Sequence, residues 1–415
     1  MQAKVRIIDV TNRDGAQSAR TNLSKLQKTM INRYLNQMGI YQSEFGFPTT
    51  WHEVHYLKAN LELAKMGILH PIILSGWIRA VSEDVEVAFS RVPEIEHLNL
   101  SISTSEQMIE GKWRGRRQFK DILEDMTEAL DLAKSKGIKT VGINAEDASR
   151  TELTRLVEFA TLAREHRADR FRYCDTVGCD NPSTIAEKIK AIAQKVQIPI
   201  ELHCHNDLGM AVANTVAGTK AAIEEGVDAY PNTTINGIGE RAGNADLVSV
   251  ILAFKYSSDL GSLWDDRIDP SLSWKLGNYL ARATGIPIPP HQPGVGEKAF
   301  QHASGIHADG IIKDPRKTYE LYGYQELGRG EPEFVETGRE ILMGDYIGTK
   351  GLRYICENFG IGLPDDDSRV MKVWELARFA NVHNQLELTA DELRFIVGYP
   401  DIVWKIITVI RPPEL

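Results

Sequence analysis

The chain has 415 residues, of which 42% are hydrophobic and 25% are charged, an ordinary composition for a globular protein. Its 48 basic and 57 acidic side chains give a net charge of −9, which excludes a general attraction to nucleic acid or anionic lipid. No apolar run approaches the ~20 residues that span a bilayer, and four cysteines are too few for a disulfide framework. We therefore expect a cytoplasmic protein that binds neither nucleic acid nor membrane.

The first 260 residues alternate strand-like and helix-like segments. Apolar or β-branched runs predict eight strands, at 5–10, 41–47, 71–77, 97–103, 139–145, 170–177, 199–205 and 230–236. Helical periodicity follows each of them, at 24–38, 51–66, 82–90, 118–136, 151–165, 182–195, 210–225 and 243–256. Eight such pairs predict an α/β fold, a (β/α)8 TIM barrel. A doubly wound open sheet is the alternative, but no glycine-rich dinucleotide turn follows the first strand.

The remainder of the chain predicts two further regions. The catalytic barrel is expected over 1–260. A linker and lid segment is expected over 261–325, and it contains the proline-rich connector GIPIPPHQPG that begins at Gly285. A mainly helical C-terminal subdomain is expected over 326–415.

The run ELHCHNDLG, which begins at Glu201, carries the clearest chemical signal. Alternate side chains of a strand share a face, so Glu201, His203 and His205 point the same way. Two imidazoles on one rigid strand form part of a cage for a divalent metal. Asp14, in the run DVTNRDGAQ at the end of the first strand, can supply an anionic third ligand. The pattern predicts a Mn²⁺, Mg²⁺, Zn²⁺ or Co²⁺ site with positions left open for a substrate.

Other polar side chains fall at the carboxyl ends of the predicted strands, where barrel active sites are built. Arg13 can grip a carboxylate or polarise a carbonyl with its planar donor fork, and a salt bridge at the barrel mouth is the alternative. Helix capping is the competing explanation for Asp147 and Ser149. The residues in this position are Arg13, Asp14, Glu44, Arg79, Thr104, Glu146, Asp147, Thr176, His203, His205 and Asn236.

Two groups of residues stand apart from the strand ends. His302 and His307 lie beyond the barrel, with Tyr319 further on, and histidine is the natural proton-transfer group near neutral pH. The run KWRGRR at 112–117 is strongly basic, although the net charge of the chain is negative. It is either a contact for a phosphate-bearing cofactor or a solvated loop.

Several motifs resemble those of metal-dependent condensing and lyase barrels, and specifically the 2-isopropylmalate synthase and homocitrate synthase family. DVTNRDGAQ is similar to the DTTLRDGEQ signature of that group. The resemblance spans roughly residues 5 to 325. It also rests on HCHNDLG (203–209), NGIGERAGN (236–244), SGIHADG (304–310), EDASRT (146–151) and DTVG (175–178).

The resemblance implies a Claisen-type condensation. The methyl group of acetyl-CoA, the co-substrate, is deprotonated and adds to the ketone of a 2-oxo acid, and thioester hydrolysis then releases a 2-hydroxy di- or tricarboxylate. It further implies a homodimer with composite active sites, in which the segment that carries His307 and Tyr319 comes from the partner subunit. The residues implied are Asp14, His203, His205 and Asn244 at the metal, Arg13, Glu146, His307 and Tyr319 in catalysis, and Gln17, Arg79, Arg150 and Thr176 in substrate binding.

The sequence also departs from the family pattern. Asn12 and Ala16, near the expected substrate, stand where the family has Leu and Glu, which leaves the 2-oxo acid open. The GKHSG run of the family is replaced by MGDYIGTKG at 343–351, and no C-terminal feedback domain is expected. The alternatives are a metal-dependent carbon–carbon lyase or aldolase on the same barrel, a citrate- or citramalate-forming enzyme, and a catalytically silent metal-binding relative.

Overall fold

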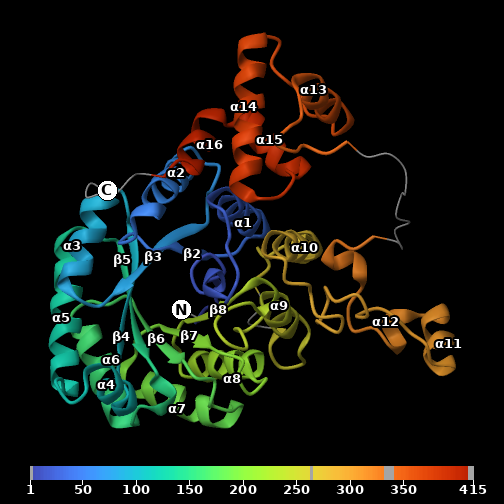
Figure 1. The fold of residues 1–415 in the computed structure, drawn as a ribbon. Coiled ribbons are helices and arrows are strands. Elements are labelled where there is room, and N and C mark those ends of the chain that lie inside the picture. Colours follow the sequence, from blue (N-terminus) through green and yellow to red (C-terminus); the bar gives the residue numbers. More distant parts are fainter. Residues whose placement is uncertain (1–2, 262–264, 331–340, 410–415) are drawn as a thin grey trace.

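Eight parallel strands close into a barrel in sequence order, with β8 paired to β1 (Figure 1). The structure is a computed structural model that describes residues 3–261, 265–330 and 341–409. The predicted (β/α)8 TIM barrel is confirmed. The strands are β1 (Ile8–Asp9), β2 (Gln42–Gly46), β3 (Ile73–Arg79), β4 (His97–Ser103), β5 (Thr140–Glu146), β6 (Arg170–Asp175), β7 (Ile200–Cys204) and β8 (Ala229–Thr233).

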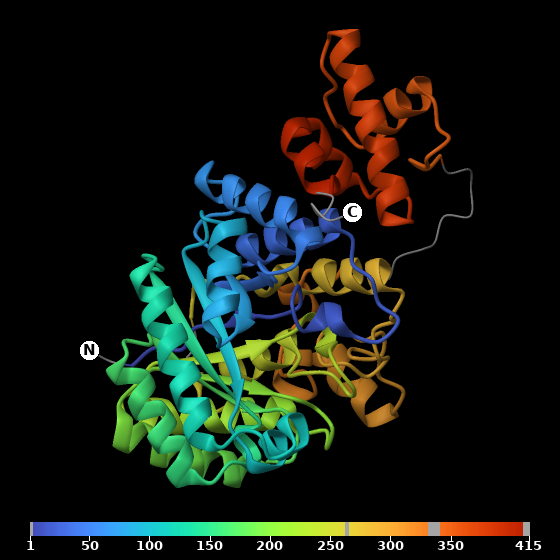
Figure 2. The same ribbon diagram turned by 60° about the vertical axis from the view of Figure 1, so that its left-hand side comes forward.

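A helix follows each strand and lies on the outside of the barrel (Figures 1 and 2). Local capping explains where several begin: Ser24 accepts the backbone N–H of Gln27, and Asn181 caps a helix that starts at Pro182. All eight predicted helices are present. They are α1 (Lys25–Met38), α2 (Val54–Lys65), α3 (Ser82–Arg91), α5 (Phe119–Ser135), α6 (Leu153–Glu165), α7 (Pro182–Val196), α8 (Ala211–Glu224) and α9 (Leu247–Tyr256).

One barrel helix, α4 (Glu106–Trp113), was not predicted from the sequence. It lies in the connection between β4 and α5, and Ser105 caps it by accepting the backbone N–H of Met108. It is short, contains Gly111, and ends where Arg114 adopts a left-handed conformation, so its helical periodicity is weak. The basic run 112–117 is therefore the end of a helix and the turn after it.

The first strand is shorter than predicted because the chain turns sharply after Val10. The backbone N–H groups of Arg13, Asp14 and Gly15 all donate to the carbonyl of Val10, at 3.2, 2.8 and 3.2 Å. This turn folds Asp14 back over the end of the barrel, where the short helix η1 (Gly15–Gln17) follows.

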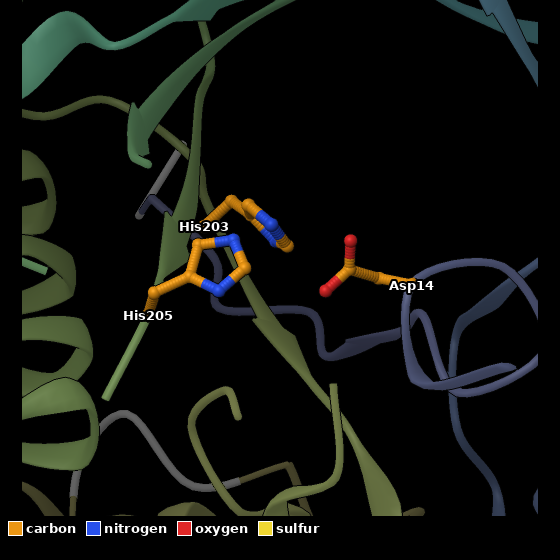
Figure 3. Close-up of side chains that lie close together, drawn as sticks. All are labelled: Asp14, His203 and His205. Carbon is orange, nitrogen blue, oxygen red and sulfur yellow. The ribbon is translucent and has the colours of Figure 1, made fainter. Parts of the chain in front are cut away.

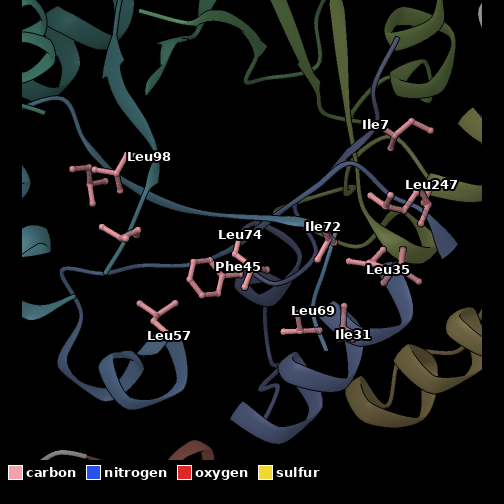
Figure 4. Close-up of a cluster of buried hydrophobic side chains, with 14 of the residues drawn as sticks. Ile7, Ile31, Leu35, Phe45, Leu57, Leu69, Ile72, Leu74, Leu98 and Leu247 are labelled. Atoms are coloured by element: carbon pink, nitrogen blue, oxygen red, sulfur yellow. The ribbon is translucent and has the colours of Figure 1, made fainter. Parts of the chain in front are cut away.

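The apolar core lies between the strands and the surrounding helices. Phe45 of β2 and Leu74 of β3 lie close to Leu57 of α2 in the same buried cluster as Ile31 of α1 (Figure 4). Burial of each such side chain contributes roughly 1.5–3 kcal/mol, so this layer supplies much of the stability of the barrel.

The chain beyond the barrel is mainly helical, as predicted. The C-terminal helices pack beside α1 and α2, where Tyr34 of α1 donates a 2.7 Å hydrogen bond to Asp391. Tyr279, in the helix that follows the barrel, donates one to Glu392 at 2.8 Å. α11 and α12 instead extend outward from the barrel (Figure 1). These elements are α10 (Ser273–Thr284), α11 (Gly305–Lys313), α12 (Pro315–Thr318), α13 (Thr349–Asn358), α14 (Asp367–Asn384), α15 (Ala390–Gly398) and α16 (Pro400–Ile407).

The boundaries predicted between the barrel, the linker and lid segment, and the C-terminal subdomain are not tested by the structure and stay predictions. Residues 1–2, 262–264, 331–340 and 410–415, which fall within the three predicted ranges, lie outside the described residues. Among the helices that the structure describes, none is both long and apolar enough to cross a membrane.

Candidate active site

Asp14, His203 and His205 meet at the carboxyl end of the barrel strands. One candidate ligand atom from each residue lies within 4.8 Å of the other two (Figure 3). His203 belongs to β7 and His205 directly follows it, and their rings are perpendicular with centroids 4.9 Å apart. All three side chains are buried. The structure therefore brings together the three residues that the sequence predicted as metal ligands.

The glycine-rich run at 236–244 places Asn244 beside this group. His205 and Asn244 form an antiparallel bridge, and Asn244 Nδ2 donates a 2.6 Å hydrogen bond to Asp14 Oδ2. Gly243 has φ = 89°, and a Cβ there would lie 2.0 Å from the carbonyl oxygen of Gly237. Only glycine fits this turn. The glycines thus fold the loop so that Asn244 reaches the candidate ligands.

The protonation states of these groups suit a metal. Burial lowers the pKa of His203 well below its usual range and also lowers that of His205, so both imidazoles are neutral near pH 7. Burial alone would raise the pKa of Asp14, but the Arg13 guanidinium lowers it below its usual range. The site thus offers one carboxylate and two neutral imidazoles.

Three buried polar atoms in this group have no hydrogen-bond partner among the described residues. They are Nδ1 of His203, Nδ1 of His205 and Oδ1 of Asn244. A buried acceptor without a partner costs roughly 1–3 kcal/mol, so such atoms call for an explanation. A divalent cation accepts electron pairs from nitrogen and oxygen ligands of this kind. The residues present therefore fit a metal.

Arg13 links the candidate ligands to a buried charge network inside the barrel. Its Nη1 donates to Asp14 at 2.6 Å, and its Nε donates to Glu44 at 2.7 Å. Glu44 in turn accepts a 2.7 Å bond from Arg172, which also donates to Glu201 at 2.7 Å. The salt bridge that was the alternative explanation for Arg13 is observed, and it places Arg13 beside the candidate ligands.

Glu201 belongs to this network rather than to the metal group. The strand pattern placed it on the face of His203, but it accepts bonds from Arg172 and from Asn232, the latter at 2.9 Å. Sequence reasoning missed the role of Arg172. Its signal was the alternation of Arg170 and Arg172 on β6, the strand paired with β7.

The fifth and sixth strand ends carry the other predicted pocket residues. Glu146 forms a 2.7 Å ion pair with Lys112 of α4. Thr176 Oγ1 accepts the backbone N–H of Asp147 at 2.8 Å, which leaves its hydroxyl proton for another acceptor. Asp147 makes no capping bond and instead pairs with Arg150 at 2.7 Å, so the capping explanation for Asp147 is wrong.

Two predicted substrate contacts lie on the rim of the barrel. The side chain of Arg79 is 66% exposed and makes a two-pronged contact with Asp84 at the start of α3, at 2.6 and 3.0 Å. Gln17 is exposed on η1. The structure does not bring them to the buried group, and their role in substrate binding stays a prediction.

Asn12 does not face the expected substrate, contrary to the expectation from the sequence. Its Nδ2 donates to the carbonyl of Lys28 at 2.9 Å and to Asn32 at 2.8 Å, both on α1. The departure at this position is therefore a contact between the turn that follows β1 and α1.

The candidate proton-transfer residues lie outside the barrel. The ring of His307, on α11, stacks on Tyr319 with centroids 4.0 Å apart, and His302 lies 5.7 Å from His307. His307 and Tyr319 are exposed, on elements that extend away from the barrel (Figure 1). The structure of one chain therefore does not bring them to Asp14.

Comparison with protein families tests the resemblance. A family model described as HMGL-like matches residues 4–278, more than half of the chain. The chain belongs to the HMGL-like family. A second model, described as homocitrate synthase post-HMGL domain-like, matches residues 295–379.

Relatives that match along nearly the whole chain show which enzymes of the family it resembles. The chain is 56% identical to citrate (Re)-synthase of Dehalococcoides mccartyi over 98% of both chains. It is 38% identical to 2-isopropylmalate synthase 2 of Caldanaerobacter subterraneus, over 97% of this chain and 96% of the relative. It is 33% identical to homocitrate synthase 1 of a Nostoc species, over 95% and 97%. The predicted family is confirmed, and so is the predicted reaction class, a condensation of acetyl-CoA with a 2-oxo acid.

Solved structures confirm the fold alone. Hydroxymethylglutaryl-CoA lyase of Pseudomonas aeruginosa has a TM-score of 0.56 at 17% identity, covering 69% of this chain and 95% of the lyase. The lyase of Brucella melitensis has a TM-score of 0.55 at 16% identity, covering 68% and 99%. The lyase alternative therefore rests on the shared barrel, whereas the condensing synthases match along nearly the whole chain.

Proposed function

We propose that this enzyme condenses acetyl-CoA with oxaloacetate and water to give citrate and CoA. The observation that carries the proposal is the 56% identity to a citrate (Re)-synthase over 98% of both chains, against 38% to a 2-isopropylmalate synthase. Citrate formation was one of the alternatives left open by the sequence. A cytoplasmic location fits this reaction and is part of the proposal.

Asp14, His203 and His205 are the proposed ligands of a divalent cation, with Asn244 as a fourth candidate. Mn²⁺, Mg²⁺, Zn²⁺ and Co²⁺ all accept such nitrogen and oxygen donors. The cation supplies Lewis-acid polarisation of the ketone of the bound 2-oxo acid. The two neutral imidazoles and the ionised carboxylate need no proton loss before they bind it.

Arg13 is the proposed stabiliser of the charge that develops on the ketone oxygen. Its guanidinium is buried and held on two sides by Asp14 and Glu44, so its orientation is set before substrate binds. Donors fixed in this way contribute most where charge appears in the transition state. Thr176 donates its free hydroxyl proton to one substrate carboxylate, and Arg150 is the partner proposed for the second carboxylate of oxaloacetate.

His307 of the partner subunit is the proposed base that removes a methyl proton from acetyl-CoA, with Glu146 beside the thioester. The proposal is supported by the exposure of His307 and by the position of α11, which extends away from its own barrel in Figure 1. A homodimer in which each lid segment reaches the other barrel completes both sites.

Release of CoA from acetyl-CoA tests the proposal directly. We expect release in the presence of Mn²⁺ or Mg²⁺ with oxaloacetate, and citrate as the product by mass spectrometry. Pyruvate, 2-oxoglutarate and 2-oxoisovalerate serve as comparison substrates. Preferential release with one of these reassigns the substrate, and release with none of the four acids contradicts the condensation.

A further inference from the structure

The basic run 112–117 begins at the mouth of the barrel. Lys112, in the last turn of α4, pairs with Glu146 at 2.7 Å and donates to Ser103 Oγ at 2.8 Å. These two residues are the last of β5 and β4. The run therefore starts beside the proposed position of the thioester and leads away from it along the rim.

Arg114 and Arg116 carry charges that no other described residue neutralises. Both side chains are exposed and form no ion pair within the described residues, whereas Arg117 is paired with Asp125. Arg114 and Gly115 adopt left-handed conformations, with φ = 50° and 74°, and this turn carries the two guanidiniums. Among the residues that the structure describes, the Arg116 side chain donates only its Nε, to the backbone carbonyl of Trp113 at 3.1 Å. In a chain of net charge −9, two exposed guanidiniums without a carboxylate partner in the described chain mark a place that attracts anions.

A cavity of about 560 Å³ opens next to this turn, between α4 and the first turns of α5 and α6. Ile109 and Phe119 give it an apolar surface, and the guanidinium of Arg155 lies 5.3 Å from the Phe119 ring centroid. The carboxylates of Glu106 and Glu110 also line it, and the first of these faces Arg155 at 4.0 Å. Aromatic and guanidinium surfaces accept a flat base, and a carboxylate accepts hydrogen bonds from an exocyclic amine.

We propose that this cavity and turn bind the 3′-phosphoadenosine end of acetyl-CoA. The adenine packs against Ile109 and Phe119, with its amine toward Glu110, and the 3′-phosphate is held by Arg114 and Arg116. Guanidinium groups bind phosphate in two-pronged, charge-assisted contacts. The flexible pantetheine arm then runs past Lys112 to the thioester. This inference rests on the proposed function, because CoA is the substrate there.

A second basic cavity is the competing location. It measures about 570 Å³, is lined by Arg20, Lys25, His52, Arg282 and His383 among others, and includes no Asp or Glu in its lining. Several of its basic groups are neutralised by carboxylates: Lys25 pairs with buried Glu53, and Arg282 lies 3.7 Å from the carboxylate of Glu387. Burial lowers the pKa of His52 and His383, so both are uncharged near pH 7. No Phe, Tyr or Trp lines it, so it lacks a surface for a purine.

Comparison of CoA with dephospho-CoA, which lacks only the 3′-phosphate, isolates the proposed contact. Isothermal titration calorimetry measures both ligands without requiring turnover. We expect the wild-type enzyme to bind CoA about 10-fold more tightly than dephospho-CoA, the size typical of charge-assisted contacts. The double variant R114Q/R116Q should lose this preference and retain its affinity for dephospho-CoA. Gln already occupies left-handed positions at Gln197 and Gln385, so the substitution fits the turn.

Two control variants locate the effect. Arg167→Gln removes an exposed arginine of the same left-handed conformation (φ = 66°) after the end of α6, at the opposite end of the barrel, and should keep the preference for CoA. R20Q/R282Q should also keep it. Loss of the preference in R20Q/R282Q, its retention in R114Q/R116Q, or its absence from the wild type would each overturn the inference. If the wild type binds neither ligand, the proposed function itself is contradicted.

Discussion

At the scale of single residues, the site depends on charges that hold one another in place. Glu44 is fully buried between Arg13 and Arg172; burial alone would raise its pKa, but the two guanidiniums lower the pKa to about 2. Asn99 donates a further hydrogen bond to Glu44 at 2.8 Å. Arg13 is therefore oriented toward the candidate ligands by a carboxylate that does not itself contact them.

Glu44→Gln tests this positioning role. The amide keeps the shape but removes the charge that orients Arg13, so we expect kcat to fall by about 10²-fold with a small change in KM for the 2-oxo acid. Mn²⁺ affinity, measured by calorimetry, should change little because Asp14, His203 and His205 remain. An unchanged kcat in the folded variant would assign Glu44 to stability alone.

His203→Ala tests the metal assignment. Removal of one imidazole from the group should weaken Mn²⁺ binding by at least roughly 10²-fold and abolish turnover with it. His166→Ala, which changes a partly exposed histidine paired with Asp131, is the control and should leave both properties unchanged. Full activity after exhaustive removal of metal would contradict the proposed mechanism.

At the scale of elements, a buried cluster joins α1 to the loop before α2. Glu53, at the end of η2 (Trp51–Glu53), accepts bonds from Lys25 at 2.9 Å, from Lys28 at 2.6 Å and from the backbone N–H of Phe47 at 2.7 Å. Burial would raise the pKa of Glu53, but the two ammonium groups lower it to about 2. This cluster fixes the start of α1 next to the loop that carries Asp14.

The Glu53 cluster predicts a loss of stability in acid. Because the carboxyl has a lower pKa in the folded chain than its ordinary value of 4.5, its contribution is complete above that pH and is lost as the pH falls toward 2. Glu53→Gln leaves two buried ammonium groups unpaired and should lower the free energy of unfolding at pH 7 by about 3–5 kcal/mol. Urea titrations at several pH values measure both effects, and an equal acid sensitivity of variant and wild type would exclude this cause.

At the scale of the whole molecule, the segment proposed as a lid exposes several large apolar side chains. Ile306, Ile312 and Leu321 are 74%, 84% and 66% exposed, beside the exposed pair of His307 and Tyr319. Apolar side chains gathered in this way mark a surface that another molecule covers. The proposed homodimer covers it with the second barrel and places the proton-transfer residues at a metal site.

Mixing two inactive variants tests the composite site. His203→Ala damages the barrel half of the site, and His307→Ala damages the lid half. In a mixed dimer one site combines the intact barrel of one subunit with the intact lid of the other, so equal mixing after unfolding and refolding should restore roughly one quarter of wild-type activity. The separately refolded variants are the controls. No recovery, with mixed dimers shown by mass spectrometry, would place both halves in one chain.

The amino-acid sequence by itself determined the barrel, because each strand and each helix has its own hydrophobic periodicity, which is visible in a short stretch of the sequence. It also predicted that Asp14, His203 and His205 lie close together, since alternation along β7 puts both histidines on one face and the strand ends of a barrel converge. Tertiary structure alone decided the contact of Asn244 with Asp14, the burial of Glu44 between two arginines, and the turning of Asn12 toward α1. These contacts join residues that lie far apart along the chain or that face a neighbouring element. The hydrophobic periodicity of a short stretch of sequence contains no information about such contacts.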